Sequence, residues 1–266
     1  MDSPLNKTIW ILWLQGWEHA PWLQRQVAKS WEVNNPDWTI QYVCLANLRD
    51  FVTDIDYIYD ETKQISPQIK SDIIRVALLH AHGGVWADAT MLCMQPLDHW
   101  INEAVHPAGL WMYHGTGGGL DIRNGAAIWF IVSIKKSPLI ERLKQAIDEF
   151  WRDHDITDTT SFLDARFRHC YDMDETFRNI WARVPYLSCE EEGQAHCLHR
   201  WNSMVEDYDW LKRIFEERPP YALKMWGWWH DIFPDPTTER CMRSTGYHAI
   251  QLSNRRKEYK HEMTVL

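Results

Sequence analysis

The stretch "SDIIRVALLHAHGGVWADATM", residues 71–91, joins a predicted helix to a predicted buried strand. Ser66 can cap this helix, and Pro67 suits its first position because the N–H that proline lacks would have no partner there. Apolar residues then recur with a helical period: Ile69, Ile73, Ile74, Val76, Ala77, Leu78 and Leu79. We expect the helix to end at Gly83-Gly84, since glycine adopts the left-handed conformation that a C-terminal cap requires.

A carboxylate follows directly after the predicted strand. The apolar run Val85-Trp86-Ala87 is typical of a short buried strand, and Asp88 comes at its carboxyl end. Ligands of open α/β sheets bind beyond the carboxyl ends of the strands. We therefore expect Asp88, together with the hydroxyl of Thr90, to hold a metal ion on a phosphate. The alternative is that Asp88 only caps the turn after the strand.

The composition is that of an ordinary globular protein. The chain has 266 residues, of which 45% are hydrophobic and 24% charged, so it can bury a large core. The net charge of −9 argues against a nucleic-acid groove as the main surface. No repeat, low-complexity tract or linker divides the sequence, and we predict one domain over residues 1–266.

The cysteines and the hydropathy pattern indicate the cellular compartment of the protein. The 6 cysteines are scattered, no basic-then-apolar signal peptide opens the chain, and no apolar stretch approaches membrane-spanning length. We therefore expect a cytoplasmic protein with free thiols. The run Arg255-Arg256-Lys257 allows peripheral contact with an anionic membrane, although so few charges attract weakly. The chain has 17 tryptophans, a residue that is usually found in cores and interfaces and that also stacks on sugars and bases.

Strands and helices alternate along the chain, which predicts an α/β fold with a mostly parallel central sheet and additional C-terminal helices. The predicted strands are 8–16, 39–45, 85–87, 107–114 and 126–134. The predicted helices are 67–82, 20–31, 137–154, 160–172, 174–184 and 206–218, with a helix-like stretch at 47–52.

Three blocks of the sequence resemble the capsular polysaccharide synthesis family: "IWILWLQGWEHAPWLQRQVAKSWEVNNPDW" (9–38), the stretch 71–91 followed by "PLDHW" (96–100), and "AAIWFIVSIKKSPLI" (126–140). That family is related to the retaining glycosyltransferases with a DXD motif, such as those of family thirty-two and the glucosylating clostridial toxins. The resemblance covers roughly residues 5–190. It implies a GT-A fold (a Rossmann-like nucleotide-sugar-binding fold), a nucleotide-sugar donor such as a UDP-sugar, and Mn²⁺ or Mg²⁺.

The resemblance also implies roles for single residues. Trp13 matches the tryptophan that stacks on the donor base, and Asp72 and Arg75 match the pair that holds the donor sugar and its phosphate. Trp86 matches an aromatic residue beside the sugar, and Asp88 matches the first aspartate of DXD. The alternatives are a core tryptophan for Trp13 and an ordinary i,i+3 helix ion pair for Asp72 and Arg75.

The sequence departs from the family pattern at two places. Thr90 replaces the second aspartate of DXD, and a hydroxyl is a weaker metal ligand than a carboxylate. His248, in "GYHAIQLS", stands where related enzymes often have a C-terminal metal ligand. Ile128 stands where relatives usually have an asparagine that contacts the sugar, and Asn124, four residues earlier, could stand in for it. Asp164, in "TSFLDARF", falls on the acceptor side and is a candidate base or an ordinary surface aspartate.

Three other segments carry weaker signals. The group Cys189, His196, Cys197 and His199 lacks the C-x-x-C spacing of a zinc site. The loop "GTGGG", 115–119, lacks the Gly-Lys-Ser/Thr ending of a phosphate loop, and we expect a mobile loop near the donor. The aromatic segment 226–236 either walls the acceptor site or packs in the core.

The predicted function is transfer of a hexosyl or pentosyl unit from a nucleoside diphosphate to a glycan or glycolipid, with retention slightly favoured. An inactive nucleotide-sugar or carbohydrate-binding protein is one alternative, and Thr90 and Ile128 favour it. A metal-dependent nucleotide-sugar phosphohydrolase is another.

Overall fold

A five-stranded sheet forms the centre of the molecule, with the strand order β2-β1-β3-β6-β5. The computed structural model describes residues 5–157, 159, 161–189, 197–198 (backbone only), 207–217, 219–225 and 235–255. The five strands are β1 (Thr8–Leu12), β2 (Thr39–Val43), β3 (Gly84–Ala87), β5 (Leu110–His114) and β6 (Ala126–Ser133). Strand β1 pairs in parallel with β2 and β3, whereas β6 is antiparallel to both β3 and β5. Only β6 therefore runs against the others, which confirms the mostly parallel α/β prediction.

A smaller sheet lies beside the first and was not predicted. It contains β4 (Met91–Cys93), β8 (Ala222–Met225) and β7 (Cys197–Leu198), in the order β4-β8-β7. Strand β8 is antiparallel to β4 and parallel to β7. Because β4 follows the main-sheet strand β3 after a short turn, the small sheet attaches the C-terminal part of the chain to the edge where β3 ends.

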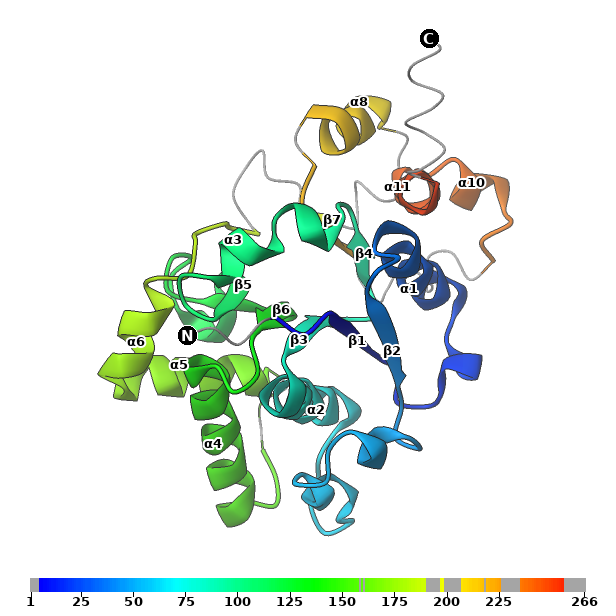
Figure 1. Ribbon diagram of the computed structural model, residues 1–266. Helices are drawn as coiled ribbons and strands as arrows, with labels where there is room; N and C mark the ends of the chain where they lie inside the picture. Colours follow the sequence, from blue (N-terminus) through cyan, green and yellow to red (C-terminus); the bar gives the residue numbers. More distant parts are fainter. Residues whose placement is uncertain are drawn as a thin grey trace.

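Helices cover both faces of the main sheet (Figure 1). On one side lie α2 (Pro67–His82), α4 (Pro138–Asp153) and α5 (Phe162–Met173), which contact one another. On the other side lie α1 (Trp22–Asn34), with α11 (Thr245–Asn254) against it, and α3 (Ile101–Val105). The remaining helices are α6 (Glu175–Trp181), α8 (Tyr208–Lys212), its π-helical continuation Arg213–Glu217, and α10 (Glu239–Met242).

The junction between α2 and β3 confirms the prediction made from residues 66–87. The Ser66 hydroxyl accepts the N–H of Ile69, and Pro67 is the first helical residue. Gly83 ends the helix with φ 70°, and its N–H donates to the carbonyl of Leu79. A Cβ at Gly83 would lie 2.5 Å from the backbone nitrogen of Lys135. Glycine is therefore required here both for its conformation and for the space it leaves.

Some predicted elements are longer than the elements in the structure. The first strand ends at Leu12 rather than at Gly16. The helix-like stretch 47–52 forms only one 3-10 turn, Leu48–Asp50. The side chain of Asn47 accepts the N–H of Cys44 and donates to the carbonyl of Tyr42, and such local bonds compete with helix formation.

Many tryptophans are core residues, in line with the composition. The rings of Trp31, Trp86, Trp111, Trp151 and Trp181 are among the largest buried side chains. The indole N–H of Trp31 donates to the carbonyl of Met91, which ties α1 to β4. Cys44, Cys93, Cys170, Cys189 and Cys241 are free thiols. Within the described ranges, no helix has both the length and the apolar character needed to cross a membrane.

Candidate functional site

Two neighbouring strand ends form the base of the site. Strands β1 and β3 are parallel and adjacent, so Trp13 and Asp88, which follow them, lie at the same edge of the sheet. The side chain of Trp13 is only partly buried. Its backbone N–H donates to the carbonyl of Val43 at the end of β2. In the part of the chain that the structure describes, Trp13 does not belong to the hydrophobic core. The core alternative for Trp13 therefore does not hold.

Asp88 is the centre of a charged cluster. Its Oδ2 accepts a hydrogen bond from Lys224 Nζ at 2.7 Å. Its Oδ1 accepts the indole N–H of Trp86 at 2.9 Å and lies 3.4 Å from Arg75 Nη2. The Asp88 backbone closes a turn by accepting the N–H of Met91, but its side chain is engaged elsewhere. Turn capping alone therefore does not explain this carboxylate.

Asp72 and Arg75 form more than a surface ion pair. Arg75 Nη2 lies 3.2 Å from Asp72 Oδ1, and both residues are about 5% exposed. Arg75 Nη1 donates to the carbonyl of Ile128 at 2.6 Å. Asp72 Oδ2 accepts the N–H of Leu163 at the start of α5. The pair thus connects α2 with β3, β6 and α5 at the point where these elements meet.

Burial and neighbouring charges lower the pKa of one carboxyl of the site and raise that of two others. Burial alone would raise the pKa of Asp88, but Lys224 and Arg75 outweigh it and hold that pKa below its usual value. Burial raises the pKa of Asp72 to about 6, against the attraction of Arg75. Burial and the neighbouring charge of Asp72 raise the pKa of Asp164 to about 6. Asp88 is therefore the most firmly ionised of the three carboxylates.

Asp164 faces a polar cavity of about 570 Å³ between α5 and the loop at 116–119. Hydroxyls of Thr159 and Ser161 also line this cavity. Arg168 fixes the loop by donating to the carbonyls of Gly118 and Gly119 at 3.1 and 3.2 Å. The electrostatic effect of Asp72 on Asp164 links the cavity to the charged cluster. Asp164 is therefore not an ordinary surface aspartate.

Two expected sugar contacts do not fit the structure. Trp86 is 1% exposed, so no face of its ring is open to a sugar. Its indole instead holds Asp88, and the Arg75 guanidinium lies 5.2 Å from its ring centroid. Asn124 donates to Asp121 within its own loop, so its amide is engaged away from Ile128. The strand β6 contributes the backbone carbonyl of Ile128 to the cluster in place of a side-chain amide.

The residues around Asp88 do not fit a resident divalent metal. Both carboxylate oxygens already face positive side chains, and Thr90 supplies no second carboxylate. A divalent cation on Asp88 would lie beside Arg75 and Lys224, which repel it. Among the described residues, no group of three or more His, Cys, Asp or Glu side chains is placed to hold a metal.

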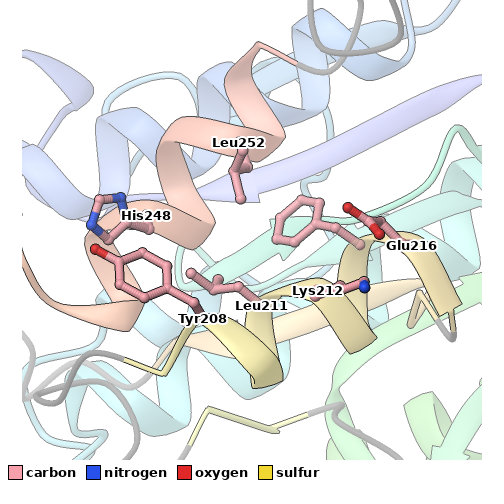
Figure 2. A pocket seen from close by; sticks show the side chains of 7 residues that line it. Tyr208, Leu211, Lys212, Glu216, His248 and Leu252 are labelled. Atoms are coloured by element: carbon pink, nitrogen blue, oxygen red, sulfur yellow. The ribbon is translucent and has the colours of Figure 1, made fainter. Parts of the chain in front are cut away.

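His248 lies at a different place. It lines a pocket of about 280 Å³ between α8 and α11, together with Tyr208, Leu211 and Leu252 (Figure 2). Figure 2 shows its ring beside that of Tyr208, and the ring centroids are 5.6 Å apart. No contact described in the structure joins His248 to Asp88. The role of His248 as a metal ligand therefore stays a prediction.

Some predictions fall outside the described residues. These are His196 and His199, the side chain of Cys197, most of the aromatic segment 226–236, and Arg256 and Lys257.

Lys224 also belongs to the site, and it was not predicted from the sequence. It lies in β8, opposite Met91 of β4, and is 6% exposed. The available signal was a single lysine within the apolar run Ala222-Leu223-Lys224-Met225. A lysine that is buried almost always has a charged partner, but the sequence did not indicate which one.

Comparison with known proteins gives the family. The family model described as "Capsular polysaccharide synthesis protein" matches residues 2–218. The chain belongs to this family. The match confirms the resemblance inferred from the three sequence blocks and extends it beyond residue 190. Lys224 lies past its end.

Curated relatives of the chain are named as glycosyltransferases. The chain is 31% identical over 104 residues to glycosyltransferase afumC of Aspergillus fumigatus, which is 35% of this chain and 27% of that protein. It is 24% identical over 161 residues to O-glycosyltransferase braB of Annulohypoxylon truncatum, covering 55% and 38%. It is 27% identical over 113 residues to an initiation-specific alpha-1,6-mannosyltransferase of Candida albicans, covering 39% and 29%. The matches thus span between 27% and 38% of the length of these relatives.

A solved structure named PaToxG glycosyltransferase is also similar. The TM-score is 0.41 at 14% identity, with 66% of this chain and 73% of that chain covered. This similarity is too low to support a conclusion about the site.

Proposed function

We propose that the chain is a glycosyltransferase that moves a sugar from a nucleoside-diphosphate donor, most simply a UDP-sugar, to a glycan or glycolipid. Membership of the family and the names of the curated relatives support this class of reaction. The observation that carries the proposal is the cluster of the buried pair Asp72 and Arg75 with the partly exposed Asp88, placed where β1 and β3 end. This is the edge of an α/β sheet at which nucleotides bind.

The donor would lie along that edge. Trp13 is partly exposed beside the strand end and can stack on the base. Asp88, whose side chain is 22% exposed, is the cluster member most open to solvent and faces the donor. The Asp72 carboxylate and the Ile128 carbonyl hold the Arg75 guanidinium in place. A cation that is fixed before the donor arrives needs no reorganisation when charge develops.

The chemistry requires stabilisation of negative charge. The bond from the anomeric carbon to the diphosphate breaks, and its electron pair stays on the phosphate oxygen. Positive side chains near that oxygen stabilise it in a site from which water is excluded. In our proposal Arg75 contributes to this positive field while Asp72 and Asp88 keep its guanidinium oriented.

The acceptor would enter the cavity beside Asp164. Hydroxyls, a carboxylate and a guanidinium line this cavity, and such groups suit the hydroxyls of a sugar. In a retaining reaction, which we favour, the leaving phosphate takes the acceptor proton and Asp164 orients the acceptor. In an inverting reaction Asp164 would itself take the proton, which requires a pH above its pKa of about 6.

Incubation with a panel of nucleotide sugars tests the proposal. The released nucleoside diphosphate is measured with and without glycan or glycolipid acceptors, in EDTA and in Mn²⁺. We expect slow release that an acceptor accelerates. Fast release that is indifferent to acceptors would instead indicate a phosphohydrolase. Donor binding in a thermal-shift assay without any turnover would indicate an inactive nucleotide-sugar-binding protein; a ligand at a hundred times its Kd adds about 2.7 kcal/mol of stability.

A further inference from the structure

Asp88 faces two positive side chains, and one of them comes from a distant part of the chain. Lys224 and Asp88 are separated by 136 positions, yet Nζ lies 2.7 Å from Oδ2. Asp88 Oδ1 already has the indole N–H of Trp86 and the guanidinium of Arg75. Trp86 and Arg75, which are close to Asp88 in the sequence, thus contact Oδ1, whereas Lys224 contacts Oδ2.

The backbone fixes this position of Lys224. Strand β8 pairs with β4 so that Lys224 is opposite Met91, and the N–H of Met225 donates to the carbonyl of Thr90 at 2.7 Å. This register brings Lys224 against the turn that carries Asp88 and Thr90. The ammonium also lies 5.9 Å from the centroid of the Trp129 ring. Lys224 is therefore held at the carboxyl end of β3 by two strands and an aromatic face.

Thr90 stands where a second DXD carboxylate would be, and the residues present do not fit a divalent metal. A donor diphosphate brings two or more negative charges towards Asp72 and Asp88. Some positive charge must offset this repulsion. Arg75 is already shared between the two carboxylates. Among the described residues, Lys224 is the other cation in ion-pair contact with Asp88.

We propose that Lys224 binds the donor diphosphate and takes the place of a divalent metal at Asp88. The inference rests on the proposed function, since it assigns the ligand of one residue in that donor site. An ammonium has three N–H donors and can serve a carboxylate and a phosphate together. As the anomeric carbon–oxygen bond breaks, its electron pair remains on the diphosphate, where Lys224 stabilises it. The acceptor oxygen forms the new bond, and its proton passes to the leaving phosphate.

Isothermal titration separates this role from the proposed function. Nucleosides and their diphosphates (uridine and UDP, guanosine and GDP) are titrated in EDTA and in Mn²⁺. The wild type should bind one diphosphate in EDTA at least about tenfold more tightly than its nucleoside, a difference of about 1.4 kcal/mol. Lys224→Met should lose most of this preference while binding the nucleoside unchanged. Lys224→Arg should keep part of it.

Lys144→Met is the matched control. Lys144 is also buried and paired with carboxylates, Asp54 at 3.0 Å and Asp148 at 2.6 Å, but it lies on α4. This variant should keep the full preference for the diphosphate. A second control, Asp88→Asn in the Lys224→Met background, removes the charge that Lys224 neutralises. It should not restore the preference if Lys224 contacts phosphate.

Three outcomes would overturn the inference. One is wild-type protein that prefers the diphosphate only in Mn²⁺. Another is Lys224→Met with an undiminished preference, and the third is a preference restored by the added Asp88→Asn change, which would make Lys224 a charge-balancing residue only. The comparison of nucleoside and diphosphate binding to the wild type in EDTA can overturn the inference even if Lys224→Met does not fold. Failure of every nucleoside and diphosphate to bind would instead count against the proposed function.

Discussion

Arg75 contacts groups that come from different elements, and its planar guanidinium makes this possible. One nitrogen reaches both Asp72 and Asp88, and another donates to the carbonyl of Ile128. An ammonium is a compact charge on a flexible stem and cannot reproduce this fork. The i,i+3 spacing of Asp72 and Arg75 made their pairing predictable. The contact with Ile128 was not, because it depends on how β6 lies beside β3.

Arg75→Lys should therefore reduce transfer at saturating donor by about 10- to 100-fold, which is about 1.4–2.7 kcal/mol of transition-state stabilisation. The measurement is the steady-state rate of nucleoside diphosphate release with acceptor. Arg142→Lys is the matched control, because Arg142 pairs with Glu149 and Asp174 away from the site. A lysine variant that keeps most of its rate would show that the bidentate geometry is unimportant.

Asp164→Asn tests the raised pKa of the cavity carboxyl. Its pKa is raised to about 6 in the folded protein, so folding is favoured while the carboxyl is protonated and loses this contribution as the pH rises from about 4 through 6. The asparagine variant has no such loss. Relative to the wild type, its free energy of unfolding should gain about 1–2 kcal/mol between pH 4.5 and pH 7.5.

Urea unfolding at both pH values measures this gain. A difference between the two proteins that does not change with pH would contradict the raised pKa. Activity supplies a separate readout: if Asp164 contacts the acceptor, the same variant should have a raised KM for the acceptor.

At the scale of elements, the turn from α2 into β3 positions the cluster. Gly83→Ala places a Cβ 2.5 Å from Lys135 N and 2.9 Å from the carbonyl of Ser133, at φ 70°. We expect a loss of about 2–4 kcal/mol in the free energy of unfolding, from the strained conformation and the steric clash together.

Lys136→Gly is the control for the conformational part of that loss. Lys136 is the non-glycine residue at positive φ (53°) within the described ranges, so glycine there should change stability by less than about 0.5 kcal/mol. Chemical denaturation measures both variants. Equal effects of the two changes would mean that the close approach of Lys135 has no cost.

How well an element could be predicted depended on its length. The long apolar pattern of α2 and the amphipathic pattern of α4 were sufficient, because each covers several turns. The strands β4 and β8 are too short to show a period, and β8 follows the pair Pro219-Pro220. Their existence depends on pairing with each other, which is a long-range contact that local patterns do not contain. Asp88 was therefore predicted and Lys224 was not.

At the scale of the whole molecule, the C-terminal part of the chain is tied to the edge of the sheet. The hydroxyl of Ser253 in α11 donates to the carbonyl of Cys93 in β4 at 2.5 Å. The carbonyl of Ser253 accepts a hydrogen bond from the side-chain amide of Asn34 in α1. Ser253 is 1% exposed, so these bonds are shielded from water. They hold β4, and through it β8, in the position that the site requires.

Ser253→Ala should lower the free energy of unfolding by about 1–3 kcal/mol, because it leaves a buried carbonyl without its donor. The transition should stay single, since α11 packs on the core through α1. Thr237→Ala is the control: among the described residues this exposed hydroxyl bonds to Asp235 in its own turn, and its loss should cost less than about 0.5 kcal/mol. A separate unfolding transition of Ser253→Ala at lower denaturant concentration would contradict the expectation that the chain unfolds as one unit.

A crystal structure with a bound nucleoside diphosphate tests the location of the donor site most directly. We expect the base to lie against Trp13 and the phosphates to lie beside Asp88, within hydrogen-bonding distance of Lys224 Nζ. A diphosphate bound elsewhere, for example in the pocket between α8 and α11 that contains His248, would contradict it.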